Sequence, residues 1–239
     1  RPPVQSPVNG PVRFVAQDYH HMQGRKNSPV TIVGRIKGLA EMIAALQPQA
    51  DIDWLWQLSV RVSSSAKPIR NKQGRLVHPA DVLVAVEPLL KELRTNHQAC
   101  SRKRLAYLRN ALTLAVMTMV PVRLKNHAGM RLGKNITRVG DHYEVHFCEA
   151  ENKTHRPYSG VLPAHLTETL DLYINEVRPR HLRKRESEHL WVSYRYGPVS
   201  AQTIYISTVA LTPELLGRPV NPHQLRDVAA TWFAVENHH

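Results

Sequence analysis

One short block of strand-like alternation interrupts a chain that otherwise has the spacing of helices. Residues 142–148 alternate between polar and apolar side chains, which is the period expected of a half-buried strand. Turn-forming residues bound this block on both sides, and residues 135–139 and 157–162 are predicted as flanking strands. Three short strands joined by tight turns predict a small antiparallel sheet.

The rest of the chain has apolar residues three and four positions apart, as in amphipathic helices. Pro121 is predicted to end a long buried helix, and a short helix is predicted after it. The chain is therefore predicted to be mainly α with a small antiparallel β-sheet, an α+β fold. The predicted helices cover residues 31–46, 51–62, 79–95, 101–120, 163–177 and 202–211, with a last helix from Pro222.

Two domains are predicted. Residues 1–29 have little periodicity and are predicted to be an irregular arm. Residues 63–76 are polar and basic and are predicted to be a linker. The division is then 1–74, an arm and a helical unit with its basic linker, and 75–239, a larger second domain. Trp54 and Trp56 are predicted to anchor the core of the first unit.

The charge balance indicates a polyanionic partner. Among 239 residues, 32 Lys and Arg stand against 19 Asp and Glu, a net charge of +13. Nucleic acid is the simplest partner for such a chain, although ribosomal or membrane-surface proteins share this sign. The candidate contacts are the basic residues Arg102, Lys103, Arg104, Lys125, Arg131, Arg183 and Lys184.

Several function classes are not indicated. Cys100 and Cys148 lie far apart without metal-ligand spacing, which favours a reduced, cytoplasmic compartment without disulfides. Neither a signal peptide nor a membrane-spanning run is visible. The sequence also lacks a Gly-rich phosphate loop, a metal-ligand cluster and a Gly-x-Ser-x-Gly motif, so neither a cofactor nor a metal is expected.

The stretch from Asn221 to Thr231 has the features of a phosphate site. Asn221 is suited to cap a helix and Pro222 to begin it. His223 and Arg226 are three positions apart, so they share one face of the first turn. The start of a helix already favours an anion. The alternative is that His223 is a capping residue and Arg226 a solvated charge.

Two more cationic residues stand at breaks in the predicted elements. Arg123 follows Pro121 directly, where a side chain can point into a cleft. Lys153 lies in the predicted turn between the second and third strands. Taken alone, such a lysine is more often a solvated turn residue.

The order of these motifs resembles the tyrosine recombinase (phage integrase) family, from about Val77 to Phe233. The first 75 or so residues are similar in position to the helical core-binding domain of that family. The resemblance implies a site-specific DNA recombinase, bacterial or encoded by a mobile element. It implies cleavage and rejoining of double-stranded DNA through a 3′-phosphotyrosyl link without a metal, by a homo-oligomer on DNA that is commonly a tetramer.

The resemblance also implies a role for each matching residue. Arg123 and Arg226 match the arginines that grip the scissile phosphate, a task that suits the bidentate guanidinium group. Lys153 matches the hairpin lysine that protonates the leaving 5′-oxygen. His223 matches the residue that takes or shares the proton of the attacking tyrosine.

Three positions depart from the family pattern. Asn126 stands where the family usually has an acidic residue, and Asp227 stands where a histidine is common. All eight tyrosines precede Arg226, whereas the family's nucleophile follows it, so we expect a missing C-terminal segment. Two alternatives remain: a non-catalytic DNA-binding protein that retains the recombinase fold, and an unrelated basic scaffold.

Overall fold

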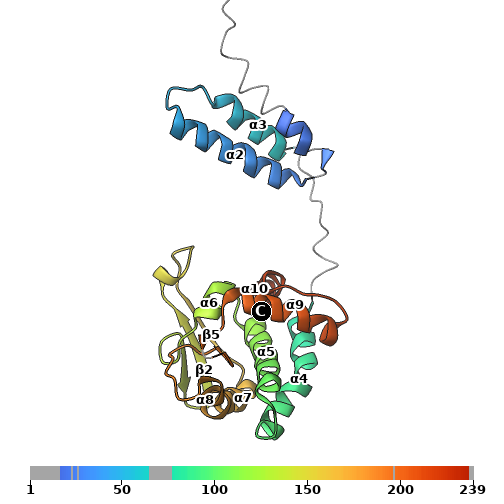
Figure 1. The fold of residues 1–239 in the computed structure, drawn as a ribbon, viewed down its shortest axis with the longest axis vertical. Coiled ribbons are helices and arrows are strands. Elements are labelled where there is room, and N and C mark those ends of the chain that lie inside the picture. The colour runs from blue at the N-terminus through green and yellow to red at the C-terminus, as the bar shows by residue number, and fades with distance from the viewer. Residues whose placement is uncertain (1–16, 23, 26, 65–76, 196, 237–239) are drawn as a thin grey trace, which may run out of the picture. The chain divides into compact units, whose positions relative to one another are not determined.

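The chain forms two compact units, Arg1–Gly74 and Arg75–His239, which are described separately (Figure 1). Most of the predicted arm and linker lies outside the described residues. Residues 17–22, predicted as part of the arm, are helical, because Met22 is buried against α2. The computed structural model describes residues 17–22, 24–25, 27–64, 77–195 and 197–236.

The first unit is built on α2 (Pro29–Leu46) and α3 (Asp53–Ser64). The two helices share a core with residues 17–22, and this core contains Met22, Ile32, Ile36, Ala40, Leu55 and Val62. Trp54 packs against this core as predicted. Trp56 does not, because it is 37% exposed on the outer face of α3.

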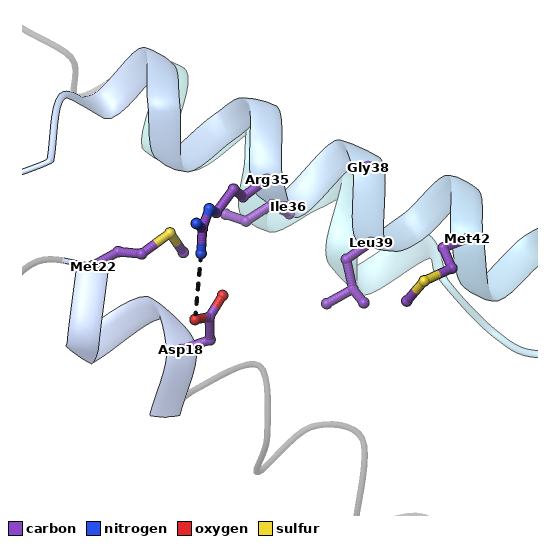
Figure 2. Close-up of a pocket in the computed structure, with 7 residues that line it drawn as sticks. All are labelled: Asp18, Met22, Arg35, Ile36, Gly38, Leu39 and Met42. Atoms are coloured by element: carbon purple, nitrogen blue, oxygen red, sulfur yellow. Dashed lines mark ion pairs between the residues drawn. The ribbon is translucent and has the colours of Figure 1, made fainter.

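A small, mainly apolar cavity of about 220 Å³ opens beside α2 in this unit (Figure 2). Met22, Leu39 and Met42 contribute to its lining. At one side, Arg35 lies 3.9 Å from Asp18. The cavity contains none of the candidate site residues.

The second unit is organised around α5 (Arg102–Met119), which pairs with α4 (Pro79–Asn96) across a short turn. Nearly every residue of α5 from Leu105 to Thr118 is buried. Ser101 caps the start of α5 by accepting a hydrogen bond from the Arg104 N–H. As predicted, α5 ends just before Pro121, and α6 (Leu124–Gly129) follows.

The predicted three-stranded sheet is present. It consists of β1 (Ile136–Val139), β2 (His142–Phe147) and β3 (Tyr158–Val161), antiparallel and in the order β1-β2-β3. The apolar residues of β2 face the core. A 3-10 turn, η2 (Glu149–Glu151), follows β2. A second small sheet, β4 (Val192–Ser193) with β5 (Gly197–Pro198), was not predicted, since strands of two residues carry no periodicity.

The single helix predicted over residues 163–177 is wrong in its detail. The segment consists of η3 (Ala164–Leu166), α7 (Thr167–Leu172) and a π-helical turn η4 (Tyr173–Val177), and α8 (Arg178–Leu182) continues it beyond the predicted end. The π turn ends two residues before Pro179, which has no N–H for an α-helical bond. Two helices complete the unit: α9 (Ala201–Leu216), longer than predicted, and α10 (Pro222–Glu236).

Candidate active site

Arg123 lies at the corner between α5 and α6. Its backbone is extended at the N-cap of α6, and its carbonyl accepts hydrogen bonds from the N–H groups of Asn126 (2.8 Å) and His127 (3.1 Å). The side chain is half-buried. Within the described residues, its guanidinium has neither a hydrogen-bonded nor an ionic partner, so its donors are available to an anion.

The buried side chain of His127 stabilises this corner between α5 and α6. Its ring is 2% exposed, and Nε2 donates a hydrogen bond to the Val120 carbonyl over 2.8 Å. Burial lowers the pKa of His127 to about 4. The ring is therefore neutral near pH 7 and joins the end of α5 to α6 across the break at Pro121.

We expect His127 to make the second unit acid-sensitive. Between pH 6.5 and 4, the unfolded state binds a proton at this residue that the folded state does not bind, so the free energy of unfolding falls as the pH falls. The loss from this one group approaches about 3 kcal/mol at pH 4. Chemical denaturation at pH 7.5 and 4.5 measures it. His127→Gln keeps a donor but cannot titrate, and it should reduce the difference; an unchanged difference would contradict the assignment.

A side-chain hydrogen bond joins the Arg123 corner to the turn that carries Lys153. Asn126 Nδ2 donates to Asn152 Oδ1 over 2.9 Å. Lys153 follows Asn152 directly and is exposed, without an ionic partner among the residues that the structure describes. The structure thus brings together the segments of two predicted site residues, with one cation half-buried and the other exposed.

Glu151 fixes the other side of the same turn. Its carboxylate binds Lys134 Nζ at 2.9 Å and accepts hydrogen bonds from Asn135 Nδ2 and the Cys148 N–H. The hydrogen bond from Lys134 is the largest of the effects that lower the pKa of Glu151 to about 2. Glu151 is therefore ionised at neutral pH and holds the base of the turn beside Lys153.

The first turn of α10 carries His223 and Arg226. Asn221 Oδ1 accepts from the Gln224 N–H, and Gln224 Oε1 accepts from the Asn221 N–H, both at 3.0 Å. This reciprocal pair is a capping box. The cap by Asn221 was predicted, but its partner Gln224 was not. His223 is exposed, and Arg226 Nη2 lies 3.5 Å from Asp227 Oδ1 at the surface.

α10 lies at the same end of the second unit as α6, of which Arg123 is the N-cap (Figure 1). It packs on α5 and α4. The Trp232 ring meets the ring of His78, the N-cap of α4, with centroids 6.3 Å apart. Because α4 and α5 are antiparallel, the start of α4 lies beside the end of α5. The elements that carry all four predicted catalytic residues are therefore gathered at one end.

Most of the other predicted basic contacts lie elsewhere. Arg102, Lys103 and Arg104 start α5, and its 18 residues span about 27 Å to its other end. Arg104 binds Glu92 through two hydrogen bonds. Arg180 donates to the carbonyls of His97 and Cys100 in the α4–α5 turn, so α8, with Arg183 and Lys184 after it, adjoins the start of α5.

Lys125 and Arg131 have different settings. Lys125 is exposed on α6, two residues from Arg123. Arg131 is paired with Glu188 over 3.2 Å. Among the predicted basic contacts, Lys125 is the one that lies beside the candidate site.

Comparisons with known proteins concern the fold. No protein-family model matches the chain, and no curated protein matches it. The crystal structure of the XerH site-specific recombinase bound to its difH substrate, a pre-cleavage complex, is similar at a TM-score of 0.53 and 13% identity over 84% of this chain. A crystal structure of XerA recombinase gives a TM-score of 0.49 and 13% identity over 94% of this chain and 79% of that one.

The chain is a mainly helical α+β protein with small antiparallel sheets, and its fold resembles that of the tyrosine recombinases, core-binding and catalytic domains together. The structural likeness to XerH extends over most of the chain. The predicted fold class and the predicted resemblance are confirmed. The matched region is 60% of the XerH chain. In the described part of this chain, no helix is long and apolar enough to cross a bilayer.

Proposed function

We propose that this chain contains the core-binding and catalytic domains of a tyrosine-type site-specific recombinase that cleaves and rejoins double-stranded DNA. The observation that carries the proposal is the hydrogen bond from Asn126 to Asn152. It joins the segments of Arg123 and Lys153, two cations without an ionic partner among the described residues, at the end of the unit where α10 begins. A scissile phosphate bound at that end has cationic groups from three separate segments around it.

The proposed reaction needs no metal or nucleotide. A tyrosine oxygen bonds to phosphorus as the bond from phosphorus to the 5′-oxygen breaks. The tyrosine proton passes to His223, and a proton from Lys153 Nζ passes to the departing 5′-oxygen. The 3′-phosphotyrosyl link conserves the phosphodiester, so the 5′-hydroxyl rejoins the strand by the reverse path.

Arg123 and Arg226 stabilise the phosphate in this scheme. Negative charge on the non-bridging oxygens grows as phosphorus becomes pentacoordinate, and positioned guanidinium groups offset it. Arg226 also has Asp227 nearby, at 3.5 Å. That carboxylate weakens the positive potential at Arg226, and it is the observation that favours the second candidate, a DNA-binding protein without cleavage activity.

We expect the affinity for duplex DNA to fall steeply with salt. XerH was crystallised with a DNA substrate, and the +13 charge of this chain suits the same kind of partner. The logarithm of the binding constant should fall linearly with the logarithm of the salt concentration, by roughly 0.9 for each phosphate neutralised. Fluorescence anisotropy with a labelled duplex, from low to moderate salt, measures the slope. A flat affinity would exclude a phosphate-based interface.

Covalent capture tests the proposed function. The full-length gene product is incubated with a library of random duplexes, denatured, and freed of DNA that is not covalently bound. Sequencing of the retained DNA gives the site, and mass spectrometry of the phosphotyrosyl peptide gives the nucleophile. Recovery of a 3′-linked adduct supports recombinase chemistry. Selective binding of some duplexes without any adduct would support the non-catalytic protein instead.

A further inference from the structure

We infer that Asn126 and Asn152 are positioning residues that hold Lys153 in place relative to Arg123. This inference rests on the proposed function and adds to it two residues that act through Lys153. Asn126 forms both halves of the link: its backbone N–H donates to the Arg123 carbonyl (2.8 Å), and its side chain donates to Asn152 (2.9 Å). The segments of the two cationic residues are therefore joined through Asn126 and Asn152.

The direction of the side-chain bond is fixed by its surroundings. Asn152 Nδ2 donates to the Arg156 carbonyl over 2.8 Å, and a carbonyl only accepts. Asn152 Oδ1 is therefore the acceptor that faces α6, so residue 126 must be a donor. An ionised carboxylate at position 126 has acceptors alone and could not form this bond.

Asn152 also holds the turn in a conformation that the backbone disfavours. The residue is 9% exposed. Its carbonyl accepts from the His155 N–H over 3.0 Å. His155 has a φ of 49°, in the left-handed region, which is unfavourable for a residue with a Cβ. Such a conformation persists only where neighbouring contacts enforce it, and both polar ends of the Asn152 side chain supply contacts.

The amide at position 126 has an electrostatic consequence as well. It ties down the turn without adding a second negative charge to the one that Glu151 already carries there. A carboxylate there would stabilise the ammonium form and so oppose release of its proton. The neutral side chain of Asn126 therefore adds no further stabilisation to the ammonium form of Lys153, which in the proposed reaction gives a proton to the departing oxygen.

Cleavage of two substrates by the full-length protein tests the inference. One is the natural duplex, and the other carries sulfur in place of the leaving 5′-oxygen, because a thiolate departs without a proton. Asn126→Ala and the isosteric Asn126→Asp should each cleave the natural duplex about 10- to 10²-fold more slowly, the scale of a displacement of about 1 Å at a reacting group. Both should cleave the sulfur substrate at nearly the unmodified rate, with unchanged DNA affinity.

Three further variants complete the design. Asn152→Ala should be at least as slow as Asn126→Ala, because it removes the bond to Asn126 and also the bond to the Arg156 carbonyl. The double variant should be no slower than Asn152→Ala, because the bond to Asn126 is already lost there. Asn175→Ala, at an exposed asparagine in η4, is the matched control and should behave as the unmodified protein. Thermal unfolding of each variant identifies any that fails to fold.

The outcomes separate this inference from the proposed function. If Lys153→Ala is rescued by the sulfur substrate but the Asn126 variants are not, the asparagines do not act through Lys153 and the inference is wrong. Asn126 variants with normal rates on both substrates would also overturn it. Failure of the unmodified protein to form any adduct would instead overturn the proposed function.

Discussion

Arg226→Ala in the full-length protein is expected to slow DNA cleavage by about 10²–10³-fold, with little loss of affinity for uncleaved DNA. The reason is that the charge which Arg226 meets grows as the phosphate becomes pentacoordinate, so the contact matters most in the transition state. Single-turnover formation of the covalent adduct measures the rate. Anisotropy with the same duplex measures the affinity.

A double variant far from the candidate site provides the contrast. Arg183→Ala with Lys184→Ala removes two exposed charges after α8. We expect weaker binding across all sequences and a smaller salt slope, with a nearly normal cleavage rate once DNA is saturating. If Arg226→Ala instead weakens binding and leaves the saturated rate intact, then Arg226 is a simple backbone contact.

Lys153→Ala is expected to lower cleavage of the natural duplex by about 10²–10⁴-fold, the usual contribution of a positioned proton donor. The substrate with a sulfur leaving group should restore most of that rate, because the missing proton is not needed there. Rates of 5′-end release on the two substrates give the comparison. Lys91→Ala, at an exposed lysine on α4, is the matched control.

The opposite result would reassign Lys153. A variant equally slow on both substrates would show that Lys153 is not the proton donor, and a variant with a normal rate on both would return it to the class of solvated turn lysines. In the first case, Lys153 would be grouped with Arg123 and Arg226 as a residue that stabilises phosphate charge.

Periodicity carried most of the fold prediction. The helices of the second unit bury one continuous core, so their apolar residues recur at helical spacing. The bounds of α4 and α5 were predicted to within one residue, whereas α9 extends five residues beyond its predicted end. The alternation of β2 identified the three-stranded sheet. The burial of Trp56 was mispredicted because it depends on tertiary contacts and not on local spacing alone. The π turn was missed because its hydrogen-bond pattern depends on Pro179.

The cationic residues of the candidate site could be predicted from the sequence, but the residues that position them could not. Arg123, Lys153, His223 and Arg226 were identified from their order along the chain, and the site assignment itself stays a prediction. Asn152 carries no sequence signal, since a polar residue in a turn is ordinary. Its bond to Asn126 spans 26 positions and becomes visible only when the β2–β3 turn and α6 meet.

The burial of α5 makes one part of the candidate site more resistant to local unfolding than another. A helix packed on every side opens only when its whole domain unfolds, and Arg123 is joined to the end of that helix through Pro121 and the buried ring of His127. Lys153 stands on a surface turn secured by a few side-chain hydrogen bonds. The position of Arg123, the proposed phosphate ligand, is therefore as stable as the domain, whereas the position of Lys153, the proposed proton donor, can be changed by single substitutions.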